Sequence, residues 1–267
     1  MERYIVFLKQ VPRSTKVGID PVTKTLKRSS SMTRTNPDDL CALQVALDLK
    51  VETGAEVVAV SMGPASAESV LREALQLGAD RAVLLSSPAF AGSDTFCTSV
   101  ALSAAARKIG FDMLFFGRMA IDGDTAQVGP EVAGMLGIPQ VTHIVEAKTP
   151  VDGRVEVVKE AGDTLQRLSV ALPCAVMVGK EFSVNPPTLA GWRRAQGMEI
   201  VRWNETDLDL DCTEVGLNAS PTKVVETEVA ESRKDTRWIA DGEALAAAFR
   251  ECLGTVEELK EEEKWTI

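Results

Sequence analysis

Residues 113–136 read MLFFGRMAIDGDTAQVGPEVAGML and contain one complete strand–loop–helix unit. The apolar run 113–116 predicts a buried strand, and the spacing of apolar residues from 125 to 136 predicts a helix that Gly137 ends. Earlier units repeat this order, with strands expected at 4–8, 57–61 and 82–85 and helices expected at 36–54, 66–78 and 93–110. Alternation at this spacing predicts a doubly wound α/β fold with a mostly parallel sheet.

The pattern changes after residue 140. Short alternating segments separated by turn residues predict an antiparallel excursion within 141–172. The other elements expected are a small hairpin at 19–26, a return strand at 175–178, a short helix opened by Pro186 and a last strand at 198–203.

The end of the chain is acidic and poor in core-forming residues. A helix is expected to begin at Asp241, within a stretch whose few apolar residues would be buried on another molecule. We therefore expect a main α/β domain at 1–203 and a C-terminal arm at 204–267.

Composition excludes several classes of protein. The 267 residues carry 29 Lys and Arg against 39 Asp and Glu, a net charge of −10, which disfavours non-specific nucleic-acid binding. Five dispersed cysteines and a single histidine give no disulfide framework, zinc motif or His-rich metal site. There is no apolar run of about 18 residues and no signal-peptide pattern at the start, so no transmembrane segment and a cytoplasmic location are expected.

The loop between the strand at 113–116 and the following helix is the most informative local pattern. Main-chain N–H groups at a helix start, together with Gly123 and the Thr125 hydroxyl, are the parts of an anion cradle. The acids Asp122 and Asp124 would repel a phosphate unless they cap the helix or face outward. These residues alone leave a phosphate site and a simple capped helix equally supported.

Two further clusters follow expected strands. Residues 7–10, 36–37 and 61–64 would meet at one sheet edge, where main-chain groups could read an adenine, with Met62 against the ring; the alternative is that they are turn and core residues. The loop 87–95 could cover a planar cofactor with Phe90, unless that ring packs inward. The G-x-G-x-x-G and G-x-x-x-x-G-K-[ST] motifs are absent from the sequence, which disfavours a nicotinamide-binding Rossmann domain and a P-loop NTPase.

Several ordered stretches together resemble the β subunit of electron-transfer flavoprotein over nearly the whole chain. They are residues 9–12, 35–39, 61–64, 77–81, 120–130, 185–186 with the helix of 192–194, and 216–224. The resemblance implies an α/β fold of the adenine-nucleotide-binding type. It also implies a heterodimer with an α subunit that carries its own FAD, shuttling electrons between dehydrogenases. The C-terminal arm would pack on that α subunit.

The resemblance also implies a cofactor site, without any catalytic residue or metal ligand. Its residues are Phe7, Lys9, Asn36, Pro37, Asp38, Asp39, Met62, Phe90, Thr95, Ala120, Asp122, Gly123, Asp124, Thr125, Ala126, Gln127 and Val128. In the family the main chain at Phe7, 36–39 and Met62 holds the adenosine part. The segment 120–128 holds the ribose and phosphate. Docking to a dehydrogenase is expected at Glu181, Phe182, Val184, Asn185 and Pro186.

The identity of the nucleotide separates two branches of the family. The stretch 122–130 is similar to the branch that binds a second FAD and bifurcates electrons from NADH, with ferredoxin or flavodoxin as the low-potential acceptor. The alternative is a plain carrier whose β subunit binds AMP structurally. A stand-alone adenine-nucleotide sensor is a second alternative, although its phosphate motif is absent.

Overall fold

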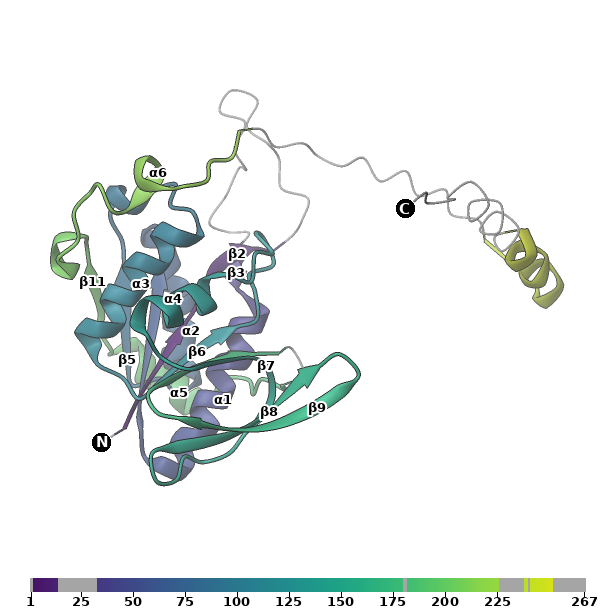
Figure 1. Ribbon diagram of the computed structural model, residues 1–267, viewed down its shortest axis with the longest axis horizontal. Helices are drawn as coiled ribbons and strands as arrows, with labels where there is room; N and C mark the ends of the chain where they lie inside the picture. The colour runs from purple at the N-terminus through teal and green to yellow at the C-terminus, as the bar shows by residue number, and fades with distance from the viewer. Residues whose placement is uncertain (1, 14–32, 180–181, 226–237, 240, 252–267) are drawn as a thin grey trace, which may run out of the picture. The chain divides into compact units, whose positions relative to one another are not determined.

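The computed structural model describes residues 2–13, 33–179, 182–225, 238–239 and 241–251 (Figure 1). The hairpin expected at 19–26 lies outside these residues. The chain separates into two compact units, residues 1–226 and 227–267. In the second unit residues 242–251 are helical, and Asp241 accepts from the N–H groups of Glu243 and Ala244, as expected for a helix start at this position.

The first unit is built on a nine-stranded sheet in the order β11-β5-β4-β1-β6-β10-β7-β8-β9. Neighbours from β11 to β7 run parallel, and β8 and β9 are antiparallel to their neighbours. The strands are β1 Arg3–Phe7, β4 Glu56–Met62, β5 Arg81–Leu85, β6 Met113–Gly117, β7 Gln140–Ala147, β8 Arg154–Ala161, β9 Thr164–Ala171, β10 Cys174–Val178 and β11 Ile200–Trp203. A separate ribbon pairs β2 Gln10–Pro12 with β3 Thr33–Thr35. The predicted doubly wound, mostly parallel architecture is confirmed.

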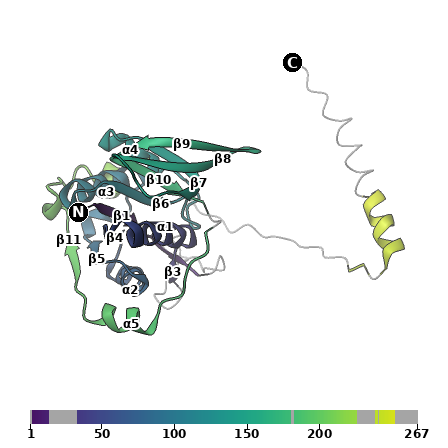
Figure 2. The ribbon, with the colours of Figure 1, turned by 90° about the horizontal axis from the view of Figure 1, so that it is seen from below.

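Helices cover both faces of the sheet, and Figure 2 shows the two layers. One face carries α1 Pro37–Thr53, α2 Glu68–Leu77 and α5 Leu189–Gln196, and the other carries α3 Thr95–Ile109 and α4 Val128–Leu136. Side chains alternate along β1 accordingly: Tyr4 and Val6 pack under α1, whereas Ile5 and Phe7 pack under α3 and α4. Burial on both faces explains why the strands read as continuous apolar runs.

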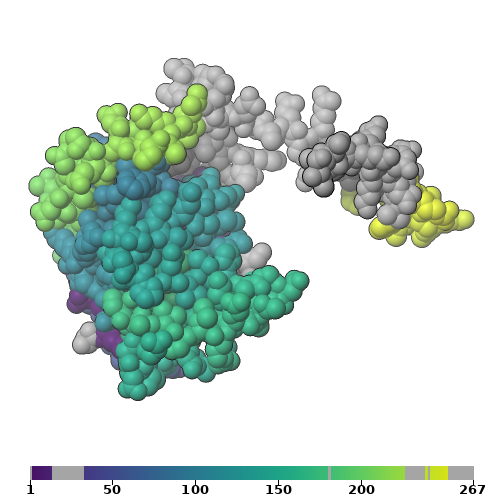
Figure 3. All heavy atoms as spheres, viewed as in Figure 1, coloured from purple at the N-terminus to yellow at the C-terminus, as the bar shows by residue number. Residues whose placement is uncertain are grey.

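One element boundary differs from the sequence prediction. Helix α4 begins at Val128 rather than 125, because Asp124 and Ala126 adopt left-handed φ angles of 49° and 53° that a helix cannot contain. The antiparallel excursion expected within 141–172 is confirmed: β7 pairs in parallel with β10 and antiparallel with β8, and the β8–β9 hairpin stands out from the body of the first unit (Figure 3).

Residues 204–225 belong to the first unit and pack on its main body. Their short helices are η4 Thr206–Leu208 and α6 Gly216–Ala219, and Leu208 and Val215 are buried. Residues 215–222, which we call the clasp, fasten onto the loop after β5, where η3 Pro88–Phe90 lies. Whether the chain from residue 204 also packs on a partner subunit stays a prediction.

Main-chain and side-chain hydrogen bonds hold the clasp. Leu217 N donates to Ala91 O at 3.0 Å, and the N–H and hydroxyl of Thr222 donate to Asp94 Oδ2 at 2.9 and 2.8 Å. The other oxygen of Asp94 accepts from Cys97 N and caps α3. Gly216 has a φ of 80°, and a Cβ on it would collide with Ala89 O, so the clasp requires glycine at this position.

Within the described part of the chain, no helix is long and apolar enough to cross a membrane. The same residues contain no group of three or more His, Cys, Asp or Glu side chains placed to hold a metal ion.

Candidate functional site

Between β1 and β6 the order in which successive strands are added to the sheet reverses. From β1 the chain crosses through α1 to β4, and from β6 it crosses through α4 towards β7 on the opposite side. In open parallel sheets a crevice forms outside the carboxyl ends of strands at such a point. Phe7 and Phe116, near these two strand ends, stack with ring centroids 4.5 Å apart and an interplanar angle of 15°. The candidate site is therefore built on the ends of β1 and β6.

Asn36 joins the start of α1 to the loop after β6. Its side chain is fully buried, with Nδ2 donating to Met119 O at 2.9 Å and Oδ1 accepting from Ile121 N at 3.2 Å. Asn36 occupies the N-cap position, as the sequence indicates, but its side chain makes no capping hydrogen bond to α1. Its amide is used instead to hold a loop that lies more than 80 residues further along the chain.

Asp39 and Lys9 tie the end of β1 to the same network. Asp39 Oδ2 accepts from Lys9 N at 2.8 Å, and Lys9 Nζ forms an ion pair with Asp122 Oδ1 at 2.7 Å. Burial raises the pKa of Asp39 to about 7, although hydrogen bonds from Asn36 and Lys9 oppose the rise. A buried carboxyl group with a raised pKa therefore joins the end of β1 to the start of α1.

Gly117 and Arg118 belong to the site; they open the loop that the sequence marks as most informative, but they were not among the predicted cofactor residues. A Cβ on Gly117 would lie 2.6 Å from both Asp38 C and Asp39 N, so the end of β6 touches the start of α1 directly. Arg118 Nε lies 3.4 Å from Asp38 Oδ2, and both atoms are buried without a hydrogen-bond partner in the described structure. The sequence signal for the contact between Gly117 and α1 was a glycine directly after an apolar strand.

The loop from Ala120 to Gln127 offers main-chain donors. Gly123 N and Asp124 N donate to Ala120 O and close a turn at the start of the loop. No described group accepts from the N–H groups of Thr125, Ala126 or Gln127, which lie in an exposed stretch with left-handed residues. Such alternation of backbone conformation creates concave sets of N–H groups that bind anions. The charge of Asp122 is partly balanced by Lys9, which reduces its repulsion of an anion.

Comparison with known proteins identifies the family of the chain. The sequence pattern of the "Electron transfer flavoprotein domain" matches residues 23–208. The chain belongs to the electron transfer flavoprotein family. It is 44% identical to the electron transfer flavoprotein subunit beta of Thermoanaerobacterium thermosaccharolyticum (86% of this chain, 89% of the relative) and 42% identical to that of Clostridium acetobutylicum (97% and 98%). It is also 42% identical to the caffeyl-CoA reductase-Etf complex subunit CarD of Acetobacterium woodii (83% and 86%).

The resemblance inferred from the sequence is therefore confirmed at the level of this electron-transfer family. No comparison tests the individual cofactor residues, so these stay predictions. The hydrogen bonds and ion pairs just described involve five of them: Lys9, Asn36, Asp38, Asp39 and Asp122. Met62 ends β4, the neighbour of β1, and is partly buried against the core under α3 and α4.

Of the remaining predicted cofactor residues, Thr95, Gln127 and Val128 lie at the starts of α3 and α4, whereas Phe90 lies in the core. Thr95 Oγ1 lies 3.2 Å from Gln127 Oε1 and 3.1 Å from Glu131 Oε1, so the starts of α3 and α4 adjoin, and Val128 is the first residue of α4. Phe90 does not cover the sheet edge. Its side chain is buried in the core, as the alternative interpretation of this loop predicted.

The predicted docking residues follow β10 in the chain and contact α1. Glu181 lies outside the described residues, and Pro186 is exposed. Phe182 and Val184 are partly buried against the core, and Asn185 N donates to Gln44 Oε1 at 3.0 Å. Docking at this segment of the electron transfer flavoprotein chain stays a prediction.

Proposed function

We propose that this chain is the β subunit of a heterodimeric electron carrier, pairs with an α subunit that holds FAD, and binds an adenine nucleotide at the crevice between β1 and β6. Buried Asn36 supports the proposal most strongly, because its side chain holds the loop that follows β6. The main-chain N–H groups at 125–127 of this loop have no described acceptor, and the loop begins where the strand order reverses. The family and the β-subunit relatives support the electron-transfer role.

The donors in the crevice fit a nucleotide with an anionic group. Phosphate oxygens would accept from the N–H groups of 125–127, with Lys9 as the nearby cation. The adenosine part would lie against main chain at 7–9 and 36–39, with Met62 beside it. A bound flavin would supply the electron-accepting and electron-donating chemistry, and the protein would supply position and electrostatics.

We further propose that the nucleotide is FAD and that the complex bifurcates electrons from NADH, with ferredoxin or flavodoxin as the low-potential acceptor. The stretch 122–130 supports this choice because it resembles the FAD-binding branch of the family. A relative named as a subunit of a caffeyl-CoA reductase-Etf complex supports a partner of the dehydrogenase or reductase class.

Counting nucleotides tests the proposal. The chain is produced with its α subunit, the complex is denatured, and released FAD and AMP are quantified by chromatography. Two FAD per heterodimer support the FAD-binding carrier, whereas one FAD and one AMP would establish the plain carrier. A complex with no nucleotide attributable to this chain would overturn the proposed site, and a stable ATP-binding homodimer would favour a sensor protein.

A further inference from the structure

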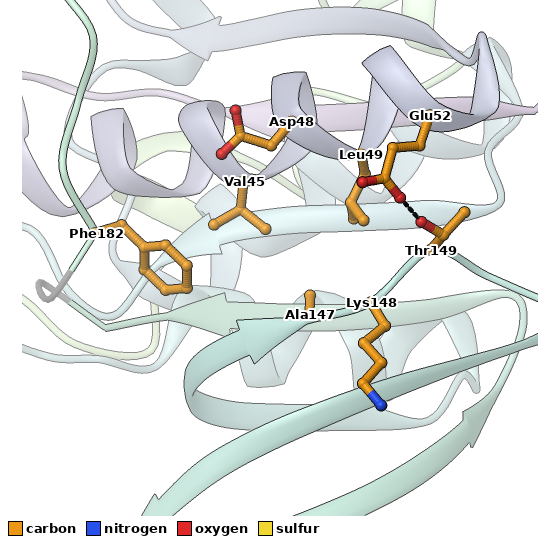
Figure 4. Close-up of a pocket in the computed structure, with 8 residues that line it drawn as sticks. All are labelled: Val45, Asp48, Leu49, Glu52, Ala147, Lys148, Thr149 and Phe182. Atoms are coloured by element: carbon orange, nitrogen blue, oxygen red, sulfur yellow. Dashed lines mark hydrogen bonds between the residues drawn. The ribbon is translucent and has the colours of Figure 1, made fainter.

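A pocket separate from the nucleotide site lies between α1 and the end of β7. It is a pocket of about 450 Å³, which we call the α1 pocket, lined by Val45, Asp48, Leu49, Glu52, Ala147, Lys148, Thr149 and Phe182 (Figure 4). Its walls come from α1, from the end of β7 with the residues that follow, and from the segment after β10. None of its residues belongs to the nucleotide network.

The inner surface of the α1 pocket is apolar. Val45 and Leu49 point from α1 towards the end of β7, and the Phe182 ring stands at one end beside them (Figure 4). Ala147 contributes the opposing wall. An apolar surface with an aromatic ring suits an alkyl chain and also suits a cation that can stack on the ring.

The rim of the α1 pocket is acidic. Asp48 and Glu52 lie one helical turn apart, and their hydrogen bonds come from the neutral groups Gln44 Nε2 and Thr149 Oγ1. Lys148 does not neutralise them: it pairs with Glu156 Oε2 at 2.8 Å and points away from Glu52 in Figure 4. In the part of the chain that the structure describes, no Lys or Arg forms an ion pair with either rim carboxylate.

We propose that the α1 pocket receives an arginine side chain from a protein partner. The guanidinium would meet the carboxylates of Asp48 and Glu52, and the alkyl stem would cover Val45 and Leu49. Arginine fits better than lysine because its planar group both forks onto carboxylates and stacks on an aromatic ring such as Phe182. Phe182 also begins the 182–186 segment predicted for docking, so the two surfaces are continuous.

Binding of capped amino acids tests the chemistry of the α1 pocket. The full chain, with ¹³C-labelled methyl groups on Val, Leu and Ala, is titrated with N-acetyl-arginine amide and with its uncharged analogue N-acetyl-citrulline amide. We expect saturable shifts of the Val45, Leu49 and Ala147 methyl signals with arginine, and affinity at least about five-fold weaker with citrulline. Equal affinity for the two, or for N-acetyl-lysine amide and arginine, would overturn the assignment.

Two double variants distinguish binding in the α1 pocket from a non-specific effect of the chain's negative charge. D48N/E52Q is expected to weaken arginine binding at least about five-fold, because both rim charges are lost. D152N/E160Q removes the same charge at exposed positions outside the pocket and should bind like the parent chain. If the two double variants bind arginine alike, the pocket is not the site. Preserved methyl spectra without arginine establish that both variants fold.

A kinetic measurement tests whether the partner dehydrogenase or reductase docks at the α1 pocket. In the complex with the α subunit, D48N/E52Q should raise KM for the dehydrogenase or reductase that exchanges electrons with it, relative to D152N/E160Q. Nucleotide content should stay unchanged, so failure of this inference is distinguishable from failure of the nucleotide site. An unchanged KM would exclude the α1 pocket from the docking surface.

Discussion

Replacing Asn36 by alanine should loosen the loop that follows β6. The change removes one donor to Met119 O and one acceptor for Ile121 N from a fully buried position. Two lost hydrogen bonds, with their main-chain partners left without a replacement, correspond to about 2–4 kcal/mol of unfolding free energy. For a unit of this size each kcal/mol lowers Tm by roughly 2–4 °C, so we expect a decrease between about 4 and 16 °C.

The assay combines thermal unfolding with nucleotide counting in the purified complex. Gln166→Ala is the control, because Gln166 is exposed on β9 and its side chain makes no hydrogen bond to the described residues, so Tm should stay close to that of the parent. N36A should lose nucleotide on gel filtration, since the main-chain donors at 125–127 would no longer be held in place. If N36A keeps both the parent Tm and the parent nucleotide content, Asn36 does not organise the site.

Three other perturbations follow from the same contacts. Gly117→Ala should destabilise the chain by about 1–3 kcal/mol in urea unfolding, because its Cβ would lie 2.6 Å from main-chain atoms of α1. Gly134→Ala is the control: it has open space around it in α4 and should stabilise the chain slightly. Equal effects of the two substitutions would contradict the close packing at Gly117. Because the folded-state pKa of Asp39 is raised to about 7, its proton binds more tightly in the folded chain, so its contribution to stability falls as pH rises from about 4 to above 7. Urea unfolding at pH 5.5 and 8 should show this loss in the parent and not in Asp39→Asn, and parallel pH dependence in both would exclude the carboxyl as the source. Gly216→Ala should open the clasp and expose residues 215–222 to limited proteolysis; an unchanged digestion pattern would show that the clasp tolerates a side chain.

Much of the fold could be predicted from sequence because its signals are local. Apolar runs ended by glycine or proline located the parallel strands and most helices. The start of α4 could not be placed in this way, since Asp124 and Ala126 adopt left-handed conformations that their residue types do not announce. Pairing of β7 with β10 also depends on contacts between segments far apart in the chain.

The site shows the same division between local and distant information. The position of Asn36 before a proline indicated a helix start, but its actual partners at 119 and 121 belong to another crossover. Burial of Asp39 against Gly117 likewise arises only when the end of β6 meets the start of α1. Phe90 illustrates the opposite case: an aromatic residue in a loop suggested a cover, and packing placed it in the core.

The clasp has a practical consequence for engineering. Because residues 215–222 are secured by their own bonds to the loop after β5, the sheet and the clasp are complete within the first unit. A label or fusion partner joined after residue 226 should accordingly leave the α/β scaffold intact.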